Sequence, residues 1–272
     1  MRIKTTKSHR NLTFEENLLK LDFLIQQRQK NVEGPTTETL VIVGLATKRR
    51  SHCHMARELI IANAGADAVI ILRAAYESTI LALYLQEHRG QIATYITFSE
   101  LTSLRNMMEL VEELKKDGSP FPGEEEQLCY IENKRNRIVE SGLLPKFKLT
   151  LDDLKNLQRI KTYTNRAHFL KFEDIRNGIT KCAENVDLFE TGFLVYNLGS
   201  QMTHSNFDMV KLMVYFDKTH PLYSEHAMYR QILCLQRNNA QILHACGYLS
   251  SANATEIAEF ALTIAKQFCQ GH

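Results

Sequence analysis

Residues 66–88 read ADAVIILRAAYESTILALYLQEH, and this apolar stretch decides the fold. Its length and its content of Ala, Leu and Ile favour a long helix buried in the protein core. Two charged residues, Arg73 and Glu77, interrupt the apolar run. Because residues four positions apart lie one turn above each other on a helix, these side chains can form an ion pair. Buried charges are costly without a partner, so we expect the pair to have either a structural or a functional purpose.

The overall composition is typical of a soluble globular protein, with 272 residues of which 44% are hydrophobic and 24% charged. The net charge of +2 is too balanced to indicate nucleic acid or an anionic membrane as a partner. The six cysteines include no CxxC pair, which argues against a zinc ribbon and against a disulfide framework. We therefore expect a cytoplasmic protein with reduced thiols.

Two further observations concern membranes and secretion. Residues 66–85 are long enough to cross a bilayer, but Asp67, Arg73 and Glu77 would each cost about 2.5 to 3.5 kcal/mol at its centre. The basic residues near the N-terminus are not followed by an apolar stretch, so we expect no secretory signal. The sequence thus predicts a protein that does not associate with a membrane.

Apolar spacing and capping signals predict helices along most of the chain. A capping box at Thr13 and Glu16 opens the first helix, and Gly34-Pro35 follows its end. The expected helices cover residues 13–32, 36–64, 66–88, 91–116, 122–142, 186–203, 206–216, 224–249 and 252–268. Since strand-like alternation, a GxGxxG motif and a P-loop are all missing from the sequence, we predict an all-α protein.

The predicted architecture is a single bundle of about seven to nine helices that spans residues 1–272. The helical pattern weakens between residues 143 and 185. Only short helices are expected there, one after the cap formed by Thr150 and Asp153 and one near residues 172–178. We interpret residues 143–185 as an insertion or a lid.

A second polar feature lies in the stretch YNLGSQMTH, residues 196–204. On a helix, one face carries Asn197, either Ser200 or Gln201, and His204. That face can hold a phosphate or a ribose, or it can simply solvate the end of the helix, where an imidazolium interacts well with the terminal carbonyls. Both interpretations are open at this point.

The two features can form one site if the helix of residues 66–88 packs on the helix that contains residues 196–204. Such a pocket would contain a cation, a carboxylate to orient it and an imidazole as general acid or base. These are groups that act on phosphates. The predicted site residues are Arg73, Glu77, Asn197, Ser200 and His204.

The densest basic run contains Lys48, Arg49 and Arg50, and it is a candidate RNA-binding patch that contacts phosphates. The alternative is an ordinary solvated helix face. The nearby His52 and His54 alternate along the helix and point in different directions, and an HExxH motif is missing from the sequence. We therefore expect neither a metal site nor a cofactor.

The stretches LRAAYESTILALYL and YNLGSQMTHS together resemble an uncharacterised family of helical bacterial proteins, which is known only as a domain of unknown function. In that family one helix carries Arg-x-x-x-Glu, and a later helix carries Ser-x-x-x-His. The matching positions here are Arg73, Glu77, Ser200 and His204. The resemblance extends over residues 56–214.

This resemblance implies a helical bundle that looks like the HEPN group, several of whose members are metal-independent ribonucleases in toxin or phage-defence systems. Active members carry an Arg a few residues before the catalytic His on the same helix. Asn197 stands in place of that Arg here, so Arg73 is expected to supply the cation. The implied function is a metal-independent ribonuclease or toxin-type effector in phage defence.

A non-catalytic alternative follows from the same resemblance. The chain would then be a helical binding or regulatory module, such as the partner subunit of a defence or toxin–antitoxin system. In that case Arg73 and Glu77 form a structural pair and His204 is a helix-end residue. The expected partners are RNA, and a second copy of the chain or a defence-system protein.

Overall fold

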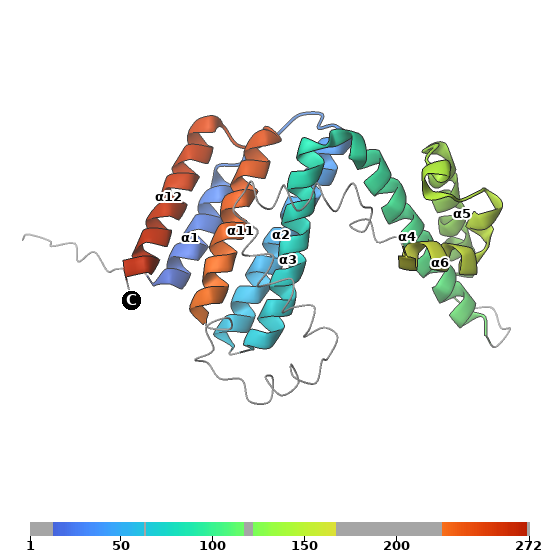
Figure 1. Ribbon diagram of the computed structural model, residues 1–272, viewed down its shortest axis with the longest axis horizontal. Coiled ribbons are helices and arrows are strands. Elements are labelled where there is room, and N and C mark those ends of the chain that lie inside the picture. The colour runs from blue at the N-terminus through green and yellow to red at the C-terminus, as the bar shows by residue number, and fades with distance from the viewer. Residues whose placement is uncertain (1–12, 63, 117–121, 167–224, 271–272) are drawn as a thin grey trace, which may run out of the picture. The chain divides into compact units, whose positions relative to one another are not determined.

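The computed structural model describes residues 13–62, 64–116, 122–166 and 225–270. The all-α prediction is confirmed, since these residues form eight α-helices and three short 3₁₀ helices, with no strand among them (Figure 1). Contacts divide the chain into two compact units. Unit 1 contains residues 1–86 and 182–272, and unit 2 contains residues 87–181.

Unit 1 joins helices from the two ends of the chain. Its described helices are α1 (Phe14–Gln27), α2 (Thr37–Ile61), α3 (Gly65–Glu87), α11 (Glu225–Ala245) and α12 (Ser251–Gln270). α11 packs against α1, α2 and α12, and α1 also packs against α12 (Figure 1). The two C-terminal helices therefore complete a core that the N-terminal helices begin.

Local hydrogen bonds explain where the first two helices start. The Glu16 backbone N–H donates to Thr13 Oγ1 over 3.3 Å, and the Thr13 N–H donates to Glu16 Oε2 over 2.7 Å. Both bonds of the predicted capping box are thus formed. At α2 the hydroxyl of Thr36 accepts from the Thr39 backbone N–H over 3.2 Å. Each cap satisfies backbone donors that the first turn of a helix leaves without a partner.

The end of α1 differs from the prediction. The helix ends at Gln27, several residues earlier than expected. The Lys30 backbone N–H donates instead to the carbonyl of Tyr248 over 3.0 Å, and Arg28 forms an ion pair with Glu256 over 3.0 Å. These bonds to a segment distant in the sequence replace further turns of helix, so the local pattern alone predicts the end incorrectly.

α3, the helix predicted from residues 66–88, is mostly buried. Its fully buried side chains include Ala68, Leu72, Ala75, Ala82 and Leu85. Among the described residues α3 alone is long and apolar enough to span a membrane, and 61% of its apolar segment is buried inside the protein. The core helix of a water-soluble protein has the same length and composition, so this property is weak evidence of a membrane span.

Unit 2 is a smaller helical unit with a core of its own. Its helices are α4 (Ile92–Leu114), α5 (Glu124–Glu140) and α6 (Leu157–Arg166), with 3₁₀ helices η1 (Arg89–Gln91), η2 (Leu144–Phe147) and η3 (Asp152–Lys155). α4 packs against both α5 and α6. The core side chains are Leu101, Leu104, Met108, Val111, Ile131, Ile138, Leu144, Phe147, Leu149, Leu154, Leu157 and Ile160.

The described part of the weakly patterned segment contains the helix that was expected after Thr150 and Asp153. The predicted cap is present, because the Thr150 backbone N–H donates to Asp153 Oδ2 over 2.8 Å. The short helix expected after this cap is also present, as the 3₁₀ helix η3 followed by α6, although Leu157 and Ile160 are the only buried large apolar residues of α6 among those whose burial is described. The packing of α6 against α4 stabilises this helix, and the spacing of apolar residues within α6 does not reveal that contribution.

The remaining expected helices, at residues 172–178, 186–203 and 206–216, lie outside the described residues. The lid assigned to residues 143–185 therefore stays a prediction. The single-domain assignment stays one as well, because compact units defined by contacts do not by themselves establish independent domains.

Phe147 should be a main stabilising residue of unit 2, since it is 0% exposed at the centre of the core. We expect Phe147→Ala to lower the free energy of unfolding by about 3 to 5 kcal/mol, because it removes buried apolar surface and leaves a cavity. Urea denaturation followed by circular dichroism measures the change. Leu151→Ala is the matched control, because Leu151 is 59% exposed, and it should change stability by less than about 0.5 kcal/mol. Equal effects of the two changes would contradict this view of the core.

Candidate functional site

The ion pair between Arg73 and Glu77 is present on α3. Arg73 Nε donates to Glu77 Oε1 over 3.0 Å. The Arg73 side chain is 21% exposed and that of Glu77 is 33% exposed, whereas the neighbouring Leu72 and Ala75 are fully buried. The pair therefore lies at the edge of the buried face of α3, where solvent reaches it.

The other predicted site residues, Asn197, Ser200 and His204, lie outside the described residues. The predicted pocket that would join them to Arg73 and Glu77 therefore stays a prediction. Within the described part of the chain, no three His, Cys, Asp or Glu side chains gather closely enough to hold a metal ion.

The basic run on α2 does not form one continuous surface. Lys48 is exposed, but Arg49 is 0% exposed. Arg50 donates from Nε to both carboxylate oxygens of Asp22 on α1, over 3.1 and 3.2 Å. Of the predicted RNA-binding residues, Lys48 alone is exposed and is not engaged in an ion pair that the structure describes.

The burial of Arg49 follows from its position on α2. Ile42, Arg49 and Ala56 are spaced by seven residues, and all three are 0% exposed. Two turns of an α-helix contain about seven residues, so these side chains lie on one stripe. Arg49 thus occupies a core position in the stripe that α2 turns toward the interior.

The guanidinium of Arg49 has no close counter-ion among the described residues. Its Nη1 lies 3.8 Å from the Cys53 sulfur, and its Nε and Nη2 have no hydrogen-bond partner among the described residues. Burial lowers the pKa of Arg49, while Cys53 and Asp22 oppose the shift. Burial also raises the pKa of the Cys53 thiol, although Arg49 counteracts it, so the thiol is protonated at neutral pH and does not neutralise Arg49.

α11 brings several amide side chains into the same interior. Gln231, Gln236, Asn238 and Asn239 are all less than 9% exposed, and their side-chain oxygens have no hydrogen-bond partner in the described part of the chain. The amide nitrogen of Asn238 does donate, to the carbonyl of Cys234 over 2.9 Å. Because α11 packs on α2, the interior of unit 1 contains a polar region as well as an apolar one.

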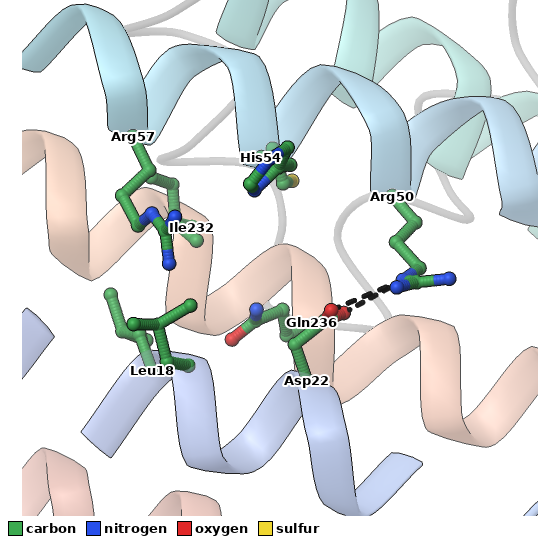
Figure 2. A pocket seen from close by; sticks show the side chains of 9 residues that line it. Leu18, Asp22, Arg50, His54, Arg57, Ile232 and Gln236 are labelled. Carbon is green, nitrogen blue, oxygen red and sulfur yellow. Dashed lines mark hydrogen bonds and ion pairs between the residues drawn. The ribbon is translucent and has the colours of Figure 1, made fainter. Parts of the chain in front are cut away.

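A pocket opens where α1, α2 and α11 meet (Figure 2). We call it the α1/α2/α11 pocket. Its lining residues are Leu18, Leu19, Asp22, Arg50, Cys53, His54, Arg57, Ile232 and Gln236. In Figure 2 the Arg57 side chain extends from α2 toward Leu18, and the Gln236 amide lies between α1 and α2. The pocket therefore combines cationic groups with one carboxylate and one amide.

The pocket was not predicted from the sequence, and the local pattern of α11 argues against it. Residues 236–239 read QRNN inside the predicted helix 224–249, and such a polar run predicts an exposed face. The structure buries Gln236, Asn238 and Asn239 instead. Only the position of α11 between three other helices, which local spacing does not reveal, explains this burial.

Comparison with known proteins gives one match. The family DUF5677, described as a family of unknown function, matches residues 39–220, which is more than half of the chain. This match confirms the resemblance to an uncharacterised family. No curated protein and no solved structure gave a significant match.

Replacing the buried cation should stabilise the protein. We expect Arg49→Met to raise the free energy of unfolding by about 1 kcal/mol or more, because it removes a desolvated charge that has no ion-pair partner among the described residues. Lys48→Met is the control, because Lys48 is exposed on the same helix, and it should change stability by less than about 0.5 kcal/mol. Urea denaturation measures both variants. If Arg49→Met strongly lowered the free energy of unfolding, the charge of Arg49 could not be a net cost to stability, and this explanation would be wrong.

Proposed function

The chain belongs to DUF5677, a family of unknown function, and from that starting point we propose that it is a HEPN-like, metal-independent ribonuclease or toxin-type effector that acts in bacterial phage defence. Arg73 and His204 are the central residues of the proposed site, and RNA is the substrate. The family match includes both residues in its range. A homodimer is the proposed assembly, in keeping with the resemblance to the HEPN group.

The position of the Arg73–Glu77 pair carries this proposal. Glu77 accepts from Arg73 Nε over 3.0 Å and so fixes the plane of the guanidinium. Both side chains are partly exposed, so a phosphate in solvent can approach them. A guanidinium presents a planar set of donors that suits phosphate oxygens. A cation oriented in this way supports phosphate chemistry better than a purely structural pair inside the core.

The proposed reaction needs no metal ion. The ribose 2′-hydroxyl attacks the adjacent phosphorus, the bond from phosphorus to the leaving 5′-oxygen breaks, and the product carries a cyclic phosphate. His204 acts as the general acid or base for the transferred proton. Arg73 stabilises the negative charge that develops on the phosphorane oxygens. Glu77, Asn197 and Ser200 orient these groups.

Substitution of His204 tests this function directly. We expect His204→Ala to reduce RNA cleavage by a factor of about 100 or more, because loss of a general acid or base typically has this effect. Cleavage of a defined RNA is measured in the presence of EDTA, with detection of the cyclic phosphate product.

His88→Ala is the matched control, because His88 is exposed on the turn after α3 and is not part of the proposed site. It should leave cleavage unchanged. EDTA-resistant cleavage that persists in a folded His204→Ala variant would rule out the assignment.

A second candidate function is a non-catalytic binding or regulatory module, such as the partner subunit of a defence or toxin–antitoxin system. One observation favours it: the arginines that sequence analysis assigned to RNA are used within the protein. Arg49 is buried and Arg50 is paired with Asp22. In this case the pair of Arg73 and Glu77 serves stability alone.

Arg73→Ala separates the two candidates. If the pair is part of a solvent-accessible site, this variant should lose RNA cleavage and only about 1 kcal/mol or less of stability. A structural pair would instead cost roughly 3 to 5 kcal/mol, because its loss leaves Glu77 without its partner. Thermal and urea unfolding measure stability, and cleavage is measured on the same preparation. A loss of stability in that higher range, with no cleavage by the wild-type protein, would favour the binding module.

A further inference from the structure

We propose that the α1/α2/α11 pocket of unit 1 binds a phosphate monoester group through Arg57 and Gln236. The phosphate belongs to a small phosphorylated ligand whose remaining part extends out of the pocket. None of the residues that line this pocket lies on α3, which carries Arg73. The pocket is thus a binding site separate from the proposed ribonuclease residues.

Two side chains in the pocket have hydrogen-bonding capacity left over. Arg57 is 12% exposed at its side chain and pairs through Nη2 with Glu58, but its buried Nε has no hydrogen-bond partner in the described residues. Gln236 is 5% exposed, and its Oε1 has no partner there either. Buried polar groups without partners are costly, so a ligand that satisfies both gains binding energy from groups that are already desolvated.

The local charge favours an anion. Arg49, Arg50 and Arg57 bring three positive charges to this part of α2, and Arg49 contacts Cys53, which lines the pocket. Asp22 is the one carboxylate in the lining, and Arg50 already holds both of its oxygens. Glu58, the partner of Arg57, is 55% exposed at its side chain and lies toward solvent. The buried side of the pocket therefore has an excess of positive charge.

The chemistry of Gln236 favours a phosphate monoester over a carboxylate. A monoester with a second pKa near 6 carries anionic oxygens and, in part of the population, a P–OH group. The anionic oxygens accept from Arg57, while P–OH donates to the Gln236 oxygen. With the amide turned over, its nitrogen donates to a phosphate oxygen. An ionised carboxylate only accepts hydrogen bonds. It can therefore bond to Gln236 only when the amide nitrogen, and not the amide oxygen, faces the ligand.

Two of the residues that line the pocket, His54 and Leu19, are exposed at the surface. His54 is exposed on α2, and Leu19 is 43% exposed on α1. A phosphate group can enter between them, with Arg57 and Gln236 on the inner side. The apolar side chains of Leu18 and Ile232, which are 1% and 2% exposed, also line the pocket.

Titration of the full-length protein with inorganic phosphate tests this site. Calorimetry at constant ionic strength should show saturable binding, and acetate should bind at least about tenfold more weakly. We expect Arg57→Gln and Gln236→Leu each to weaken phosphate binding about tenfold or more, because each removes one buried hydrogen bond to an anion. Circular dichroism and thermal unfolding establish that the variants are folded.

Two control variants make the result specific. Arg28→Gln removes a positive charge from unit 1 at an exposed ion pair with Glu256, and it should leave phosphate binding unchanged. Arg73→Gln is the second variant, and it distinguishes binding in the pocket from binding at the proposed site on α3. Three outcomes would overturn the proposed site. They are the absence of saturable phosphate binding, acetate binding as tight as phosphate binding, and phosphate binding that persists in a folded Arg57→Gln variant. Loss of binding in Arg73→Gln alone would assign the phosphate to α3, which overturns this inference but not the proposed function.

Discussion

The packing of α11 against α1, α2 and α12 is the constraint on which unit 1 depends. The buried Ile232, Leu235 and Ile242 of α11 supply apolar surface that completes the core begun by the N-terminal helices. A helix with neighbours on several sides buries more than one apolar stripe. The polar residues between these apolar positions, such as Gln236 and Asn239, are therefore also removed from water.

The same packing explains why hydrogen-bonding groups in this interior have no partner among the residues that the structure describes. Those on α2 are mainly donors, on Arg49 and Arg57, while those on α11 include the acceptor oxygens of Gln236 and Asn239. The two sets are complementary in chemistry, but the described geometry does not join them by hydrogen bonds. Natural sequences usually satisfy such groups, and exceptions occur mostly at functional sites. Polar groups left in this state make the α2–α11 region a better candidate for ligand binding than the apolar core around it.

Local signals determined which parts of the fold could be predicted. The capping box at Thr13 and the cap at Thr36 depend on residues three positions apart, so the sequence shows them directly. The end of α1 depends on a hydrogen bond from Lys30 to Tyr248, which no local pattern contains. The helical region after Thr150 was expected from its cap, whereas the packing of α6 on α4 has no local signal.

The candidate sites show the same division between local and distant interactions. The pair of Arg73 and Glu77 was predicted because its partners are four residues apart on one helix. The burial of Arg49 was missed, although its seven-residue spacing from Ile42 and Ala56 on the interior stripe was a usable signal. The basic residues on either side of Arg49, Lys48 and Arg50, obscure this seven-residue spacing, because a run of three basic residues is typical of an exposed helix face. The α1/α2/α11 pocket required the position of α11, which is distant in the sequence.

Arg73 and Arg49 lie on consecutive helices, and the residue four positions later determines their different properties. Glu77 compensates the charge of Arg73, whereas the protonated Cys53 does not compensate that of Arg49. A compensated cation gains little from binding a ground-state anion, but it can still stabilise charge that develops in a transition state. Arg49, which has no ion-pair partner among the described residues, contacts Cys53 of the α1/α2/α11 pocket, and its charge favours an anion there that is already fully charged. In the proposed assignments α3 therefore serves chemistry and the α1/α2/α11 pocket serves binding, so the two arginine-containing sites need not compete for the same ligand.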